Sequence, residues 1–162
     1  MEKKFELTDK FVFNTFGIKL FQIKCTKSFK YAKEGDLGGY VEKDENLDQE
    51  SDAWVSGNAW VYGNAQVSGN AWVYGNARVS GNADIENDNN HCGFDCFGSC
   101  NRHTHAYLTK DNKVEITCGC FRGSIEEFEK KVEGTHSGTI YEKQYKAIIN
   151  VIKIKFGLTD LI

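Results

Sequence analysis

The stretch AWVSGNAWVYGNAQVSGNAWVYGNARVSGNADIE at residues 53–86 repeats a six-residue unit. Each unit begins with alanine, has an aliphatic residue at its third position and, in the first five units, ends with Gly-Asn. This period is typical of a parallel β-helix, in which each hexapeptide forms one side of a coil. The aliphatic residues are therefore predicted to point inward and to stack from coil to coil: Val55, Val61, Val67, Val73, Val79 and Ile85.

The residues beside each inward aliphatic are predicted to face outward, because successive side chains of a strand alternate between its faces. This places five aromatic residues on the outside: Trp54, Trp60, Trp72, Tyr62 and Tyr74. A three-sided coil of eighteen residues would stack Trp72 on Trp54 and Arg78 on Trp60. A two-sided coil of twelve residues would instead stack the two tyrosines, and the period is compatible with both geometries.

Residues 1–36 are predicted to form an N-terminal β cap, and residues 37–90 are predicted to form the hexapeptide-repeat β-helix. Short β-rich runs at 10–16 and 17–25 indicate a hairpin or a small sheet. The glycine-rich stretch EGDLGGY at 34–40 is predicted to be a turn that leads into the repeat. Val41, Leu47 and Ala53 keep the six-residue register, which predicts one degenerate coil before the regular ones.

Residues 91–162 are predicted to form a C-terminal α+β cap with two helices. A loop rich in cysteine and histidine precedes two strand-like runs around the turn at 110–113. Ser124 and Glu127 have the spacing of a capping box, which marks the start of a helix predicted to end at Gly134. A second helix is predicted to end near Gly157.

Composition narrows the classes of function. The 162 residues carry 20 basic and 23 acidic side chains, a net charge of −3, with no basic stripe that would indicate nucleic-acid binding. The charged start lacks an apolar run behind it and no stretch is long enough to span a bilayer, so we expect a cytoplasmic protein without membrane partners.

The repeat resembles the hexapeptide-repeat, left-handed β-helix superfamily over roughly residues 41–86. The stretch GDLGGYVEKDENL before the repeat and the tail CGCFRGSIEEFEKKVEGTH also resemble small hexapeptide-repeat proteins of phages, prophages and gut Firmicutes. Left-handedness and a bacterial host cytoplasm are what this resemblance implies. Better-known superfamily members are acyltransferases, in which a histidine at a subunit boundary acts as the base for transfer from coenzyme A.

Two chemical interpretations rest on the histidines and cysteines. Structural zinc is an alternative that we do not favour over free thiols beside a flexible loop. Its candidate ligands are Cys92, Cys96, Cys100, His103, His105, Cys118 and Cys120, with Cys118 and Cys120 expected to face the same way on a strand. The repeat has no histidine, so an acyltransferase would have to use His136 or His91 as its base.

The aromatic surface favours a non-enzymatic binding protein, because Trp and Tyr anchor protein interfaces. We expect the binding residues to be Trp54, Trp60, Trp72, Tyr62, Tyr74 and Arg78. With the phage resemblance, the expected partner is a host protein such as a CRISPR or other defence effector, or a sequestered ligand. We also expect a homo-oligomer, either a dimer or a trimer, which would cover the patch. A purely structural, self-assembling component is a third class.

Overall fold

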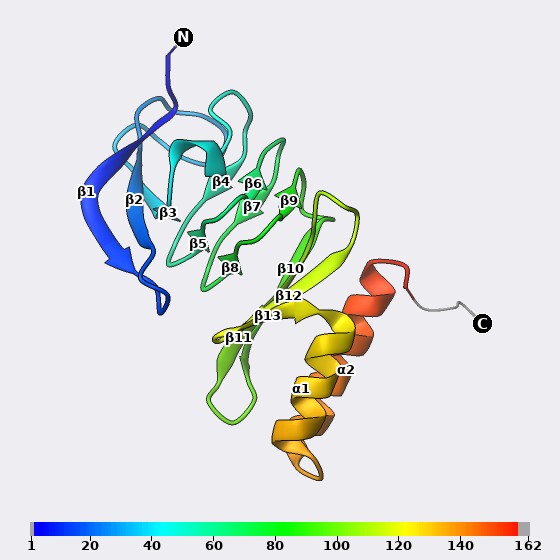
Figure 1. Cartoon of the computed structure of the whole chain (residues 1–162). Helices are drawn as coiled ribbons and strands as arrows, with labels where there is room; N and C mark the ends of the chain where they lie inside the picture. The colour runs from blue at the N-terminus through cyan, green and yellow to red at the C-terminus, as the bar shows by residue number, and fades with distance from the viewer. Residues whose placement is uncertain (1, 159–162) are drawn as a thin grey trace.

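The computed structural model describes residues 2–158. It consists mostly of strands in several sheets, followed by two helices (Figure 1). The N-terminal hairpin lies at one end, short strands stack like rungs in the middle, and a second sheet with the helices lies at the other end. No helix in this part of the chain is both long and apolar enough to cross a membrane.

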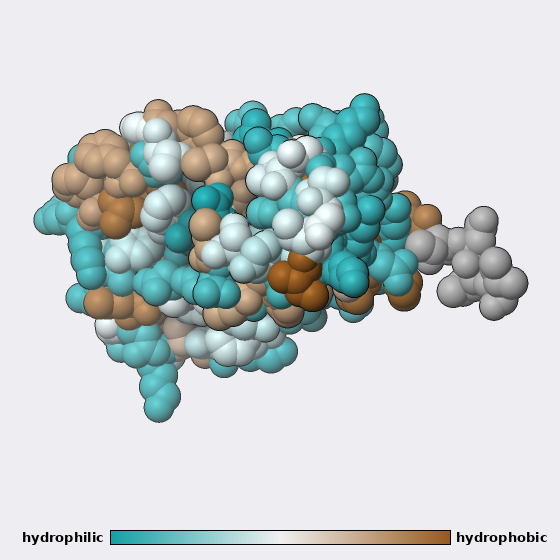
Figure 2. Space-filling model, turned by 90° about the horizontal axis from the view of Figure 1, so that it is seen from below, coloured by the Kyte–Doolittle hydropathy of each residue, from teal (hydrophilic) through white to brown (hydrophobic). Residues whose placement is uncertain are grey.

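The predicted N-terminal hairpin is confirmed. Strands β1 (Phe5–Phe13) and β2 (Lys19–Cys25) pair antiparallel. The turn between them is held by Asn14, whose Oδ1 accepts hydrogen bonds from the backbone N–H groups of Phe16 and Ile18, both at 2.9 Å. Viewed from below in Figure 2, hydrophobic residues gather at the end of the molecule that carries this hairpin, where Phe16 is 69% exposed.

The predicted turn at 34–40 is wrong over its second half, because Leu37–Val41 form strand β3. This strand pairs antiparallel with β2 and in parallel with β5 (Trp60–Val61), so one sheet runs from the hairpin into the repeat. A Cβ at Gly38 would lie 2.6 Å from the Val55 carbonyl oxygen, and one at Gly39 would lie 2.8 Å from the Ala59 carbonyl oxygen. The glycines thus serve close strand packing rather than a turn.

The repeat forms short strands that pair in parallel with partners eighteen residues along the chain. The register joins Trp54 to Trp72, Trp60 to Arg78 and Gln66 to Asp84. Besides β5, the strands are β4 (Trp54–Val55), β6 (Gln66–Val67), β7 (Trp72–Val73), β8 (Arg78–Val79) and β9 (Asp84–Ile85). The pairs have the eighteen-residue spacing, and no described pair of these repeat strands has the twelve-residue spacing. All six aliphatic residues predicted to face inward are at most 1% exposed.

The register predicted for the degenerate coil is wrong by two residues. Val41 pairs with Val61, and Leu47 forms a parallel bridge with Val67, so both spacings are twenty residues. The inward position after Leu47 is consequently Val55 rather than Ala53. A short 3-10 helix, η1 (Asp44–Asn46), lies within this coil and buries an asparagine side chain.

The second sheet contains four antiparallel strands in chain order. They are β10 (His91–Phe97), β11 (Arg102–Leu108), β12 (Val114–Cys118) and β13 (Phe121–Ser124). The hairpin around 110–113 is confirmed. The loop predicted for the cysteine- and histidine-rich segment is wrong, because residues 91–97 pair with β11.

The two predicted C-terminal helices are α1 (Ile125–His136) and α2 (Ile140–Lys155). The capping box is confirmed: Ser124 Oγ accepts from the backbone N–H of Glu127 at 3.1 Å, and Glu127 Oε1 accepts from that of Ser124 at 3.2 Å. The end predicted at Gly134 is wrong, because α1 continues for two residues to His136. The His136 ring stacks on Tyr145 of α2 at 5.6 Å, which stabilises that last turn.

Strand β11 separates two hydrophobic cores. Its Tyr107 belongs to the core that fills the repeat, whereas Ala106 belongs to the core between the second sheet and the helices. Alternating side chains of one strand therefore serve opposite faces of the sheet. The helices cover the face of this sheet that points away from the repeat (Figure 1).

Candidate functional site

A cavity of about 710 Å³ lies where the β1–β2 turn, the β5 and β8 strands and the β12–β13 turn meet. This size is within the range of ligand-binding pockets, about 300–1,000 Å³. Its walls combine aromatic and basic side chains, and we call it the aromatic–arginine groove: Phe16, Trp60, Tyr62, Phe121, Arg78, Arg102 and Arg122. Five stretches of the sequence, from the β1–β2 turn, the repeat and the second sheet, supply these side chains.

The repeat side of the groove is fixed by Trp60 and Arg78. The Arg78 guanidinium carbon lies 3.9 Å from the centre of a Trp60 ring, in a cation–π contact. Arg78 Nη1 also donates to the backbone carbonyl of Asn58 on the neighbouring coil at 2.8 Å. Burial lowers the pKa of Arg78, but a guanidinium remains protonated in proteins. The pair is thus a rigid, positively charged and aromatic wall.

The opposite wall comes from the second sheet. Arg122 lies 3.7 Å from Glu115, a weak contact between partly exposed groups. Arg102 forms no ion pair with any carboxylate of residues 2–158. A hydrogen bond with Ser99 lowers the pKa of the exposed Cys100 thiol, and the hydrogen bond and positive charge of Arg102 lower it further. Arg102 therefore offers the groove a guanidinium without a carboxylate partner within the described chain.

A second cavity of about 580 Å³ adjoins the groove, because both are lined by Arg102, Cys120, Phe121 and Arg122. Its far side is formed by α1 and α2 and includes His136 and Tyr145. Burial, together with a contact of 3.6 Å to the Cys118 sulfur, raises the pKa of Tyr145. The two cavities extend the groove from the repeat toward the helices.

The structure divides the six predicted binding residues into two sets. Trp60, Tyr62 and Arg78 line the groove. Trp54 and Trp72 pair with each other on a different side of the repeat, and Tyr74 follows Trp72 there. The predicted aromatic surface is consequently not one continuous binding site.

Trp54 is not an exposed binding residue, which corrects the prediction. It is 2% exposed, because the Phe29 ring packs edge-on against it at a centroid distance of 5.3 Å. Tyr31 stacks on Trp72 at 5.2 Å and leaves it 38% exposed. The segment that carries these two rings thus folds over one side of the repeat.

Within residues 2–158, no cluster of three or more His, Cys, Asp or Glu side chains has an arrangement that could hold a metal ion. The predicted zinc candidates do not meet at one site: Cys92, His103 and His105 line one cavity, whereas Cys100, Cys118 and Cys120 line another. Cys118 is buried at the end of β12 while Cys120 is exposed in the following turn, so these two do not share a strand face as expected. Cys92, Cys96 and Cys100 are also free thiols.

The two histidines considered as catalytic bases lie in separate places. His136 faces the cavity beside the helices and contacts Tyr141 and Tyr145. His91 lies in another cavity together with His103 and His105, and both of its ring nitrogens have hydrogen-bond partners. Neither histidine lines the aromatic–arginine groove.

Arg102 and Arg122 were not predicted as binding residues, yet both line the groove. Both lie outside the repeat, and their approach to Trp60 depends on how the second sheet packs against the last coil. A hydrogen bond of 2.6 Å from Thr117 Oγ1 to the Arg78 carbonyl oxygen is one contact that fixes this approach.

A search against protein-family models and a search of curated proteins both find no match.

Proposed function

We propose that this protein is a non-enzymatic binding protein that holds an acidic segment of a partner protein in the aromatic–arginine groove. The observation that carries the proposal is the convergence of Trp60, Arg78 and the carboxylate-free Arg102 on one cavity. Tryptophan, tyrosine and arginine dominate the binding energy of protein interfaces. Guanidinium groups recognise carboxylates through paired hydrogen bonds.

The lining chemistry supports binding over catalysis. General acid–base catalysis requires a titratable side chain within reach of the reacting proton. Apart from the arginines, the titratable side chains among the described residues that line the groove are Tyr62 and Cys120, and none is a histidine, aspartate or glutamate. The lining instead supplies flat aromatic surfaces and fixed positive charges, which suit recognition of a complementary surface.

An acidic protein segment fits this groove better than nucleic acid. Proteins that bind single strands need a basic track along several nucleotides in addition to stacking rings. Here Arg78 donates to backbone carbonyls and Arg122 faces Glu115, which leaves Arg102 as the cation with most freedom to bind a ligand. One such cation between aromatic walls suits a short carboxylate-bearing segment.

The proposal extends to the biological role and to the architecture of the repeat. We infer that the coils form a short left-handed parallel β-helix, a reading that the eighteen-residue parallel spacing supports. The resemblance to phage and prophage hexapeptide-repeat proteins supports a host component, such as a defence effector, as the partner. By occupying an acidic surface of that component, the protein would inhibit it.

The test uses a fluorescent peptide of glutamates with one central phenylalanine, and its binding is followed by fluorescence anisotropy. Arg102→Glu should reduce affinity at least tenfold, because it replaces an attractive charge in the groove with a repulsive one. Lys10→Glu is the matched control, since Lys10 is an exposed cation on β1 outside the groove. The control should bind as the native chain does.

Affinity capture from a bacterial lysate with the same three proteins then identifies the natural partner. A protein retained by the native chain and the Lys10→Glu control but lost with Arg102→Glu supports the proposal. Tighter binding of a thymidine oligonucleotide than of the acidic peptide would contradict it in favour of single-stranded nucleic acid. Equal peptide binding by Arg102→Glu and the native chain would remove the groove as the site.

A further inference from the structure

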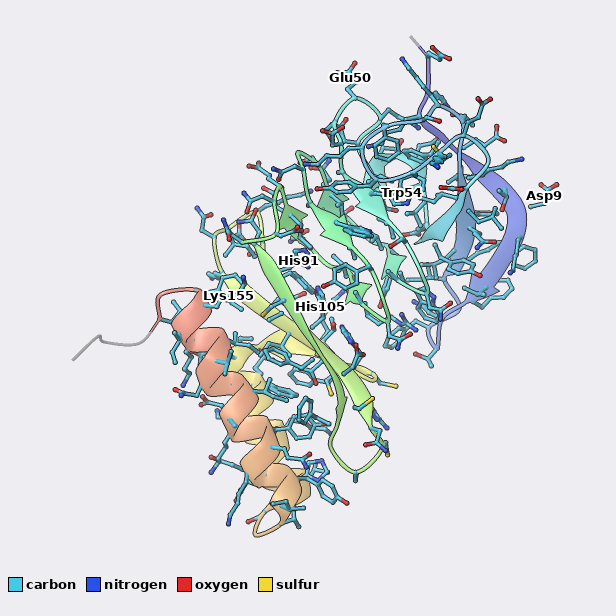
Figure 3. All side chains as sticks on the ribbon, turned by 180° about the vertical axis from the view of Figure 1, so that it is seen from behind. Asp9, Glu50, Trp54, His91, His105 and Lys155 are labelled. Carbon is cyan, nitrogen blue, oxygen red and sulfur yellow. The ribbon has the colours of Figure 1, made fainter. Side chains whose placement is uncertain are left out.

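Three histidines and two aspartates form a continuous row of hydrogen bonds between the second sheet and the repeat. His91 Nδ1 lies 2.9 Å from His105 Nε2, and His105 Nδ1 lies 2.9 Å from His103 Nε2. The row ends at Asp95, whose Oδ1 is 2.6 Å from His103 Nδ1, and at Asp88, whose Oδ1 is 3.2 Å from His91 Nε2. Figure 3 shows His91 and His105 next to each other where the repeat meets the second sheet. We call these five residues the histidine row.

The geometry of the row fixes how many protons it must hold. Each of its four contacts needs one proton, because two lone pairs facing each other at such distances repel. A neutral imidazole carries a single N–H, so three neutral rings supply one proton too few. With both carboxylates ionised, the row is fully hydrogen-bonded only when one ring is an imidazolium.

An outer ring is better placed than the central one to carry this positive charge, because each outer ring contacts an aspartate. Burial, followed by the neighbouring His91 and His103 rings, holds the pKa of His105 well below its ordinary value. Burial also lowers the pKa of His91, although its hydrogen bond to Asp88 opposes this effect. The short contact of 2.6 Å between His103 and Asp95 is typical of a charge-assisted hydrogen bond. Whether the charge lies on His91 or on His103, the His105 ring stays neutral. Only the His105 nitrogen that carries the proton differs between the two cases.

Few other titratable groups face the row. Lys155 from α2 approaches the backbone carbonyl of Asp88 at 3.4 Å and disfavours a cation on His91 (Figure 3). Tyr74 from the repeat and Cys92 from β10 line the same cavity, which has a volume of about 330 Å³. Burial raises the pKa of Cys92, so its thiol stays neutral. The two aspartates are therefore the charges that stabilise the additional proton.

We propose that the histidine row is a proton-binding site that holds one shared proton, and that release of this proton opens the contact between His103 and His105. The row lies apart from the aromatic–arginine groove and shares no lining residue with it. Loss of the proton leaves two lone pairs facing each other in one ring–ring contact. His103 is the ring that moves, because it lies at the more exposed end of the row, with a 10% exposed side chain against 6% for His91.

The row also connects the proton to the repeat. Asp88 Oδ1 accepts from the backbone N–H of Trp72 at 2.9 Å as well as facing His91. When the charge moves or leaves, the Asp88 carboxylate changes how strongly it accepts from Trp72. A change in the protonation of the row can thus affect strand β7 and the exposed Tyr74 that follows it.

The experiment is a pH titration of the native protein, with histidine labelled in ¹⁵N, from about pH 5 to about pH 9 by long-range ¹H–¹⁵N NMR. The six ring nitrogens of the row should share four protons at low pH and three after release. The backbone amide of Trp72 should shift with the same midpoint. His136, which lies outside the row, provides an internal comparison.

Asp95→Asn keeps the acceptor oxygen but removes one stabilising charge, so the midpoint should fall by about one pH unit or more. Asp111→Asn, in the exposed turn between β11 and β12, is the matched control and should leave the midpoint unchanged. The proposal is overturned if each ring carries a single proton throughout the titration, or if Asp95→Asn titrates like the native chain. It is also overturned if a chelator alters the native spectrum, since a metal would then occupy the row.

Discussion

Truncation of Trp54 tests whether the segment around Phe29 covers the repeat. Trp54 is almost completely buried beneath Phe29, whereas its neighbour on the next coil, Trp72, keeps 38% of its surface exposed. If the side chain were an outward binding residue, its removal would hardly change the stability of the fold. If it belongs to the core, its removal should be among the most destabilising single changes.

The size of the effect follows from the buried surface. A fully buried tryptophan removes up to about 250 Å² from water, which at about 25 cal/mol per Å² gives an upper bound of about 6 kcal/mol. Truncation of buried Phe or Trp to alanine costs about 3–5 kcal/mol in practice, and Trp54→Ala should fall there. Scaling by the buried fraction gives about 2–3 kcal/mol for Trp72→Ala.

Thermal unfolding followed by far-ultraviolet circular dichroism measures both variants without relying on tryptophan fluorescence. For a chain of this length, each kcal/mol lowers the midpoint by about 2–4 °C, so Trp54→Ala should unfold on the order of 10 °C below the native protein. Trp72→Ala should lose about half as much. Equal midpoints for the two variants would refute the burial of Trp54 beneath Phe29.

Three further predictions concern single positions. Burial lowers the pKa of Lys4 to about 8, so the unfolded chain binds more protons between about pH 8 and pH 10.5. The difference in the free energy of unfolding between the native protein and Lys4→Met, measured by urea unfolding, should therefore rise with pH in this window. A difference that does not change with pH would argue against a buried ammonium. Gly69→Ala should lower the thermal midpoint more than Gly75→Ala. Both glycines have positive φ, but only at Gly69 would the Cβ clash with a backbone oxygen, that of Glu86 at 2.1 Å; equal midpoints would contradict this. Ser124→Ala should cost about 1 kcal/mol in urea unfolding through loss of the α1 cap, and an unchanged midpoint would count against the capping box.

The repeat could be predicted in detail because its signal is local and periodic. One aliphatic residue every six positions determines which side chains point inward, and the structure buries all of them. The covering of Trp54 has no such signal, because Phe29 lies outside the repeat and reaches it through a turn closed by the Phe29–Ala32 bridge. Alternation predicts that a side chain leaves the coil, but not whether another segment of the chain covers it.

The candidate groove was predictable only on its repeat side. Trp60, Tyr62 and Arg78 follow from their outward positions, whereas Arg102 and Arg122 depend on the docking of a separate sheet. The histidine row could not be predicted from the sequence either, because it depends on how two strands pair. Alternation places His103 and His105 on one face of β11, but their meeting with His91 requires the register in which His91 pairs with Tyr107.

The aromatic–arginine groove and the histidine row are both products of the contact between the second sheet and the last coil of the repeat. An open coil end exposes unpaired backbone groups and must be covered. Here the Lys110 backbone N–H donates to the Asn82 carbonyl at 2.9 Å, and Tyr107 enters the repeat core. The docking that covers this end also places Arg102 in one cavity with Trp60 and holds Asp88 against the Trp72 backbone N–H, so a weaker docked state should affect both sites together. The proton held by the histidine row, which is linked through Asp88 to the repeat, is thus placed where it can bias that docking.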